Sequence, residues 1–161
     1  MVLHPGATAP SRRWPAALFG SSARTLAAAG IAVVFAGTEA DEAAVQTALP
    51  EAGPGAVSLA GRQTLGELAA LIEGAAVLVA NNSAAAHLAA ALGTPVVDLY
   101  ALTNPQHTPW RVAARVLSHD VPCRWCLKSV CPQGHHDCLR RVAPAQAAAA
   151  AFELMQPQPA G

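Results

Sequence analysis

The feature that most constrains the fold is an alternation of short apolar runs with longer Ala- and Leu-rich runs through the first 118 residues. The short runs are rich in β-branched residues and predict strands over 2–4, 31–36, 56–60, 76–80 and 95–100. They do not alternate polar with apolar residues, which is typical of a parallel sheet covered on both faces. The longer runs predict helices between the strands. The sequence therefore predicts a doubly wound, parallel α/β domain.

Several residues mark the predicted helix ends. Pro15 suits the first turn of a helix over 15–29, and Gly30 ends it. The next helix ends near Leu49. Thr64 and Glu67 have the spacing of a capping box, in which side chain and backbone bond each other at a helix start, and they open a helix over 64–74. The helix over 83–92 is closed by a glycine at 93.

The remaining residues differ in composition from the first 118. Residues 119–142 are rich in Cys, His and Arg. Residues 143–155 predict a closing helix, and residues 156–161 predict a frayed tail. We divide the chain into these four parts, 1–118, 119–142, 143–155 and 156–161.

Composition excludes several classes of protein. The chain of 161 residues is 53% hydrophobic and 12% charged, so it has enough apolar material for a core and does not resemble a disordered chain. Ten basic residues balance ten acidic ones, which gives no overall field to attract nucleic acid. No apolar run reaches the roughly 20 residues that span a bilayer, and the first residues lack a signal-peptide pattern. We expect a cytoplasmic protein.

Ligands of doubly wound sheets bind beyond the carboxyl ends of the strands. The loop that begins at Asn81 follows a predicted strand and opens a helix, whose free amides and dipole favour an anion such as a pyrophosphate. His87 lies four residues after Ser83, on the same helix face, and could donate to a phosphate oxygen. An ordinary capped helix with a histidine filling a crevice is the alternative.

A second candidate is the loop over 4–15, which contains Thr8, Ser11, Arg12 and Arg13. Arginine between a strand and a helix can bind phosphate through two parallel hydrogen bonds. The alternative is a solvated loop in which only Trp14 enters the core. The chain contains neither GxGxxG nor P-loop spacing, which argues against a simple dinucleotide oxidoreductase or an NTPase.

Glu39 follows the second predicted strand. An acidic residue there often accepts hydrogen bonds from ribose hydroxyls in nucleotide-binding α/β folds. An acid stabilised by a helix N-terminus explains the same position equally well.

Four cysteines fall in one short stretch, with the spacing CxxC-x4-C-x6-C and two histidines beside them. These are the residue types of a structural zinc or an iron–sulfur site, but the spacing lacks the paired CxxC motifs of a zinc ribbon. Free thiols under a loop, or a disulfide formed after purification, are the alternatives. A reducing compartment disfavours disulfides. The residues are Cys123, Cys126, Cys131, Cys138, His135 and His136.

Long stretches of this sequence follow a known family pattern in order and spacing. HPGA and RRWP within 4–15, VVFAGTEADE over 33–42, and LAGRQTLGELAALIEGAAVLVANNSAAAHLAAALGTPVV over 59–97 resemble the C-terminal domain of glycosyltransferase family 9, the ADP-heptose:lipopolysaccharide heptosyltransferases. CPQGHHDCL over 131–139 is similar to the corresponding segment of some members. The resemblance covers residues 2–155.

The resemblance implies one half of a GT-B enzyme, in which two Rossmann-like domains enclose the active site. The C-terminal half binds the nucleotide-sugar donor, ADP-heptose or a similar sugar nucleotide. The implied reaction is an inverting transfer to a lipid-linked saccharide of the lipopolysaccharide type, without a metal or other cofactor. Arg12 and His87 are the implied catalytic residues. The implied donor-binding residues are Thr8, Arg12, Glu39, Gln63, Thr64, Asn82, Ser83, Ala84 and His87.

The chain departs from the family pattern at several positions. The family usually has Asp-Ser/Thr-Gly where this chain has Asn82, Ser83 and Ala84, and a lysine is common at the position of Arg12. We therefore treat the heptose as the family's default sugar. The resemblance covers only the C-terminal half of such an enzyme, so we expect a fragment or truncated product that lacks the N-terminal acceptor domain and catalyses little alone. In the family, attachment to the inner membrane would come through that domain.

The alternative function is a non-catalytic nucleotide- or metal-binding module that keeps the fold without transfer. A nucleotide-sugar epimerase of the same shape would need paired catalytic carboxylates, which the sequence does not suggest.

Overall fold

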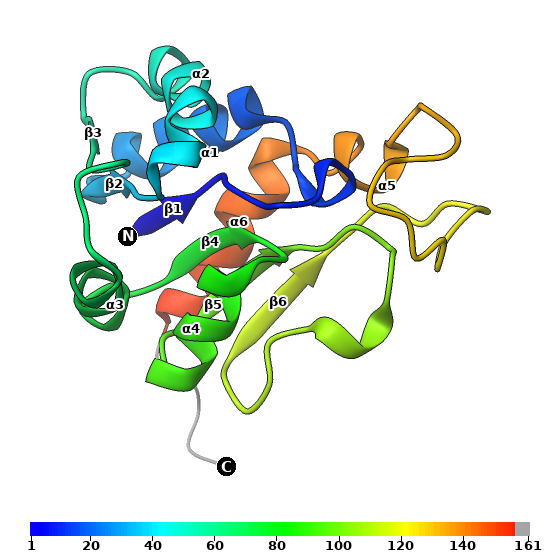
Figure 1. Cartoon of the computed structure of the whole chain (residues 1–161). Coiled ribbons are helices and arrows are strands. Elements are labelled where there is room, and N and C mark those ends of the chain that lie inside the picture. The colour runs from blue at the N-terminus through cyan, green and yellow to red at the C-terminus, as the bar shows by residue number, and fades with distance from the viewer. Residues whose placement is uncertain (157–161) are drawn as a thin grey trace.

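The strands form one parallel sheet. The computed structural model describes residues 1–156, apart from the side chain of Pro105. Six strands pair in the order β3-β2-β1-β4-β5-β6, all parallel (Figure 1). This order reverses between β1 and β4, which is the point where ligands bind in doubly wound folds. The predicted doubly wound fold is confirmed. The predicted tail lies, except for Gln156, outside the described residues.

The first strand has its predicted bounds, and the other four predicted runs give shorter strands. Six strands are observed within the described residues. They are β1 (Val2–His4), β2 (Val33–Phe35), β3 (Ala56–Ser58), β4 (Leu78–Asn81), β5 (Val96–Leu99) and β6 (Ala114–Leu117).

Helices cover both faces of the sheet. On one face lie α1 (Ala16–Ala28), α2 (Glu42–Ala52) and α6 (Pro144–Met155), around a core that includes Phe19, Leu26 and Phe35. On the other face α3 (Leu65–Glu73) and α4 (Ala84–Leu92) enclose a smaller core. Consecutive strand residues point to opposite faces, so both cores draw on the same strands. Figure 1 shows the sheet between these two layers.

Two features correct the predictions. The strand β6 was not predicted, because it is an edge strand whose residues are only partly buried or exposed, so its apolar signal is weak. The helix α2 continues through Pro50 to Ala52, beyond the predicted end at Leu49. Proline removes one backbone hydrogen bond there, but the added turn buries Ala52 in the core.

The predicted helix ends are largely confirmed. The amide of Thr64 donates to Glu67 at 2.8 Å, and the amide of Glu67 donates to the Thr64 hydroxyl at 3.3 Å, which completes the capping box. Gly93 ends α4 with φ of 79°, a left-handed conformation that glycine adopts without strain.

Short helical turns join these elements. They are η1 (Pro10–Arg12), η2 (Glu39–Asp41), η3 (Pro105–His107) and α5 (Asp137–Arg140). Both η1 and η2 follow the carboxyl ends of strands. They therefore lie at the edge of the sheet where a ligand would bind.

Candidate functional site

The loops that carry the predicted binding residues all leave the same edge of the sheet. The strands are parallel, so the segments after β1, β2, β3, β4 and β5 emerge on one side. Thr8 and Arg12 follow β1, Glu39 follows β2, and Asn82 follows β4. The fold therefore brings Thr8 and Asn82, which are 74 positions apart in the sequence, to one edge of the sheet, the rim.

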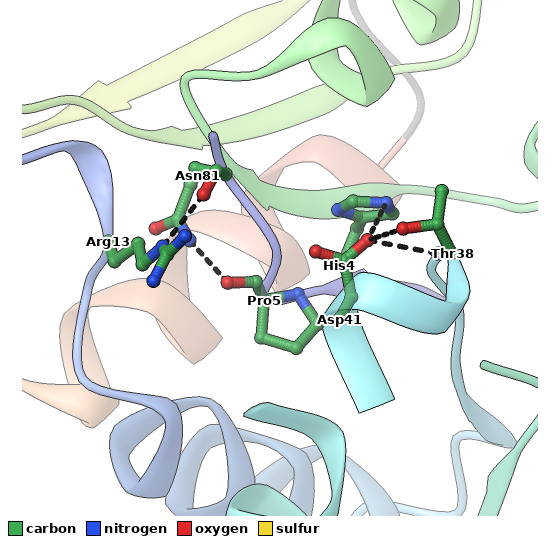
Figure 2. Close-up of polar contacts among 7 residues, drawn as sticks. His4, Pro5, Arg13, Thr38, Asp41 and Asn81 are labelled. Carbon is green, nitrogen blue, oxygen red and sulfur yellow. Dashed lines mark hydrogen bonds and ion pairs between the residues drawn. The ribbon is translucent and has the colours of Figure 1, made fainter. Parts of the chain in front are cut away.

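Asn81 joins the loop after β1 to the end of β4. Its side-chain Nδ2 donates to the carbonyl of Pro5 at 2.7 Å, and its Oδ1 accepts from the amide of Trp14 at 2.9 Å. Asn81 is fully buried, so these bonds form away from solvent. Figure 2 shows Asn81 beside Pro5 at this position. Both ends of the 5–14 loop are therefore fixed to the strand at the switch point.

His4 and Asp41 form a second polar cluster on this rim. The Asp41 carboxylate accepts from the amide of Thr38 at 2.9 Å and from its hydroxyl at 2.8 Å, and lies 3.9 Å from His4 Nε2 (Figure 2). Burial lowers the pKa of His4, and the Asp41 charge partly opposes this. A Cβ at Gly6 would lie 2.0 Å from this carboxylate, so only glycine allows the approach.

The loop over 5–14 that follows β1, called the β1 loop below, contains two arginines with different surroundings. Arg13 Nε donates to the carbonyl of Ala7 at 2.7 Å, so this side chain stabilises the loop itself. The Arg12 side chain, half-buried, makes no hydrogen bond or ion pair with the described residues. Its charge reaches Tyr100, whose pKa it lowers against the larger opposing effect of burial. Arg12 thus remains available to an anion.

The N-terminus of α4 is more open than an ordinary capped helix. Ser83 occupies the N-cap, but its side chain makes no capping bond, and its Oγ is buried without a partner among the described residues. Ala84 and His87 are exposed. Amides in the first turn of a helix lack intrahelical partners. They and the helix dipole therefore face this rim beside an exposed histidine.

Behind this helix lies a buried carboxyl group. Asp98 in β5 is fully buried, and neither oxygen has a partner among the described residues. Burial raises the pKa of Asp98 to about 7. Tyr100 lies close enough for the Asp98 charge to contribute to the raised pKa of the tyrosine.

The other predicted residues are spread along the rim. Glu39 is exposed at the start of η2. Thr64 is exposed, and the capping box uses its hydroxyl and amide. Gln63 is half-buried, with an unpartnered Oε1 among the described residues. Asn82 is buried, and its Nδ2 donates to the carbonyl of His107 at 3.0 Å. The assigned contacts of these side chains with a donor stay predictions.

The candidate loops predicted from the sequence begin at Asn81 and at His4, but several side chains of this region were given no role: Asn81, His4, Asp41, Asp98 and Tyr100. HPG at the end of the first strand and Asn81 at the end of the fourth were the available signals. Their partners lie far away in the chain, and nothing in the local pattern indicates the pairing.

A cavity with a volume of about 310 Å³ lies at this edge. Arg13, His136 and Arg140 line it, together with prolines of the β1 loop and Trp14. Ligand pockets begin at about this volume. Neither Arg12 nor His87 lines this cavity, so the predicted diphosphate contacts lie on the open rim beside it.

All four cysteines are thiols, and no disulfide joins them within the described residues. Burial raises the pKa of the Cys138 thiol, and the three other cysteines, which lie near it, raise it further. They surround a second, small cavity lined also by residues of the loop after β5.

The order of the sheet, the free helix N-terminus at the switch point and the unpaired arginine are typical of the α/β class of domains that bind nucleotides at this edge. This chain belongs to glycosyltransferase family 9 (heptosyltransferase), whose family model matches residues 1–136. It is 38% identical over 110 residues to lipooligosaccharide heptosyltransferase 2 of Haemophilus influenzae. The matched region covers 65% of this chain and 32% of that relative. It is 32% identical over 146 residues to lipopolysaccharide heptosyltransferase 2 of Escherichia coli, with coverage of 87% and 42%.

Solved structures have the same fold. A glycosyltransferase family 9 protein from Veillonella parvula superposes with a TM-score of 0.83 and 28% identity, covering 96% of this chain and 46% of that one. E. coli heptosyltransferase WaaC with ADP-2-deoxy-2-fluoro heptose superposes with a TM-score of 0.69 and 18% identity, covering 94% and 42%, and shows a likeness of fold alone. The chain thus spans about a third to a half of these proteins.

Within the described residues, none of the helices combines the length and the apolar character that a membrane crossing requires.

Proposed function

We propose that this chain is the donor-binding half of a heptosyltransferase, and that it binds the ADP part of an ADP-sugar at the rim between β1 and β4. The observation that carries the proposal is the open N-terminus of α4 at the switch point, with Arg12 unpaired in the neighbouring loop. Family membership gives the class of ligand. The WaaC structure that shares the fold contains an ADP-heptose analogue.

The diphosphate would lie between two groups of donors. Thr8 and Arg12 from the β1 loop approach it from one side. The amides that follow Ser83, close to the small side chain of Ala84, approach from the other. Arginine supplies two parallel donors to phosphate, and the helix dipole adds a favourable field. His87, one turn into α4 and exposed, donates to a phosphate or sugar oxygen.

The nucleoside would lie along the rim toward β3. Glu39 accepts hydrogen bonds from the ribose hydroxyls, as an acid after the second strand does in related folds. Gln63 and Thr64 border the adenine. The Oε1 atom of Gln63 is buried and has no hydrogen-bond partner among the described residues, so it is free to accept a hydrogen bond from a ligand. Asn82 completes the site near the sugar.

The proposed reaction is an inverting transfer. The acceptor oxygen attacks the anomeric carbon as the bond from that carbon to the phosphate oxygen breaks, and its proton passes to a base of the acceptor domain. The leaving ADP gains negative charge, which Arg12, His87 and the helix N-terminus stabilise. The acceptor is a lipid-linked saccharide in this proposal. This chain supplies the donor side, and an acceptor domain is needed to position both substrates.

Calorimetry with ADP tests the binding site. The wild-type chain is expected to bind ADP and to gain thermal stability from it. Arg12→Ala and His87→Ala remove donors to a charged group, so each is expected to weaken binding by roughly 10- to 100-fold.

Arg24→Ala is the matched control, because Arg24 in α1 is exposed and pairs with Glu51 of α2, and neither residue belongs to the proposed site. It should bind ADP like the wild type. Unchanged binding in both site variants would contradict the residue assignment, and absence of binding at millimolar ADP would contradict the proposal itself.

A further inference from the structure

The cysteine thiols of the 123–138 segment surround a cavity that the donor site does not use. Cys123, Cys126, Cys131 and Cys138 line it together with His135, and all four cysteines are partly buried. Its volume is about 20 Å³. That is room for one body the size of a water molecule. A single ion therefore fits the space between these side chains.

The orientation of His135 suits a sulfur neighbour that carries negative charge. Its Nδ1 accepts a hydrogen bond from the amide of Asp137 at 3.0 Å. A neutral imidazole that accepts through Nδ1 carries its proton on Nε2. The Nε2 lies 3.7 Å from the sulfur of Cys123. His135 thus points a proton at this sulfur, as residues around metal-bound ligands do.

The backbone around the cavity has a conformation that local interactions do not explain. Trp125 and Leu127, on either side of Cys126, have φ of 62° and 53°, and His136 has φ of 55°. Residues other than glycine adopt this left-handed region only when the surrounding structure imposes it. The segment contains only one short helix, and Leu127 and Val130 are exposed, so apolar packing supplies little of that constraint.

We propose that the four thiols bind one zinc or iron ion in a tetrahedral site, and that this ion is the cross-link that fixes the 119–142 segment. Four thiolates are the ligand set of tetrahedral zinc and of mononuclear iron. Within the described residues no three candidate ligands are already gathered around a point. Binding therefore draws the thiols inward by side-chain rotation, and each thiol releases its proton to solvent.

The site is connected to the β1 loop by hydrogen bonds. The hydroxyl of Ser11 donates to the carbonyl of Lys128 at 2.7 Å, and its amide donates to the carbonyl of Ser129 at 2.9 Å. His136 Nε2 lies 2.6 Å from the carbonyl of Ser11. Ser11 precedes Arg12, so an ion that fixes the segment also fixes the backbone beside this arginine. This connection does not depend on what the β1 loop binds.

Metal analysis of the intact chain is the primary test. The protein is expressed with both zinc and iron in the medium and purified under reducing conditions without chelator or metal-affinity resin. We expect about one zinc or iron ion for each chain. Cys126→Ser and Cys138→Ser are expected to fall to less than about a tenth of that content. Ser129→Ala, in the same segment but bonded only through its backbone, is expected to keep the wild-type content.

A second measurement uses only the wild-type chain, in case the cysteine variants do not fold. Chelator-treated, reduced protein is titrated with Co²⁺. The expected result is a thiolate-to-cobalt charge-transfer band with the intense visible bands of tetrahedral coordination. Amide exchange of residues 9–13 should slow on metal binding. Wild-type protein without zinc or iron above background and without these cobalt bands would overturn the proposal, as would full metal content in both folded cysteine variants.

Discussion

The α/β body over 1–118 and the cysteine-rich segment over 119–142 hold their shapes in different ways. In the body, large side chains such as Leu26 and Phe35 are fully buried between sheet and helices. In the segment, Leu127 and Val130 are 68% and 65% exposed, and only scattered residues such as Leu139 reach the core. Burial of apolar surface stabilises the body, whereas the segment depends on a few hydrogen bonds and, as proposed, on one ion.

This contrast has a functional meaning. The body fixes the strand ends, and with them Asn81 and the start of α4. The segment contacts the loop after β1 through Ser11. A change in the segment can therefore alter the β1 loop without unfolding the sheet.

Truncating one leucine in each region tests the comparison with the largest expected effect. Leu26→Ala should reduce the free energy of unfolding by about 2–5 kcal/mol, because it leaves a cavity in a closed core. Leu127→Ala should change it by less than about 0.5 kcal/mol, because that side chain is already solvated. Urea denaturation of both variants measures the difference. Equal losses would show that the segment contributes to stability as a packed core does.

Two glycines test how tightly the body is packed. A Cβ at Gly20 would lie 2.1 Å from the carbonyl oxygen of Ala48, where α1 crosses α2, whereas a Cβ at Gly66 in α3 meets nothing within 4 Å. We expect Gly20→Ala to destabilise the protein by about 1–3 kcal/mol. Gly66→Ala should stabilise it by about 0.5–1 kcal/mol, since alanine favours a helix. Thermal denaturation of both variants gives the sign, and a neutral Gly20→Ala would argue for looser helix packing.

The buried carboxyl of Asp98 in β5 gives an effect on stability that depends on pH. Burial raises its pKa from 3.8 to about 7, so the folded chain keeps a proton that the unfolded chain releases. The contribution of this group to stability therefore falls as pH rises from about 4 to 7 and stays low above that range.

Asp98→Asn removes this titration. The variant should gain stability relative to the wild type at pH 8, and the gain should shrink as pH falls toward 4. Denaturation curves of both proteins across this range measure it. A difference that does not vary with pH would mean that Asp98 is not protonated in the folded chain.

Much of the fold was predictable because it depends on local patterns. Five of the strands, the flanking helices, the capping box at Thr64 and the glycine end of α4 follow from residues close in sequence. The edge strand β6 was missed because its half-exposed residues lack a clear apolar run. The continuation of α2 past Pro50 was missed because the burial of Ala52 outweighs a local preference.

The candidate site was predictable only in part. Arg12, Glu39 and His87 were selected by their places after strands or in a helix start, and the structure puts them on one rim, although their contacts with a donor stay predictions. The bonds of Asn81 and the approach of Asp41 to His4 could not be foreseen, since each joins residues separated by tens of positions.

By itself, the sequence determined the order and type of the elements, the family to which the chain belongs and the chemistry available in each loop. Those properties depend on apolar periodicity, turn residues and motif spacing, all of which act over a few positions. Only the tertiary structure decided which strands are neighbours, that Arg12 is left without a partner while Arg13 is used by its own loop, and that four cysteines share one cavity. These outcomes depend on packing between distant segments, whose free energies no local pattern records.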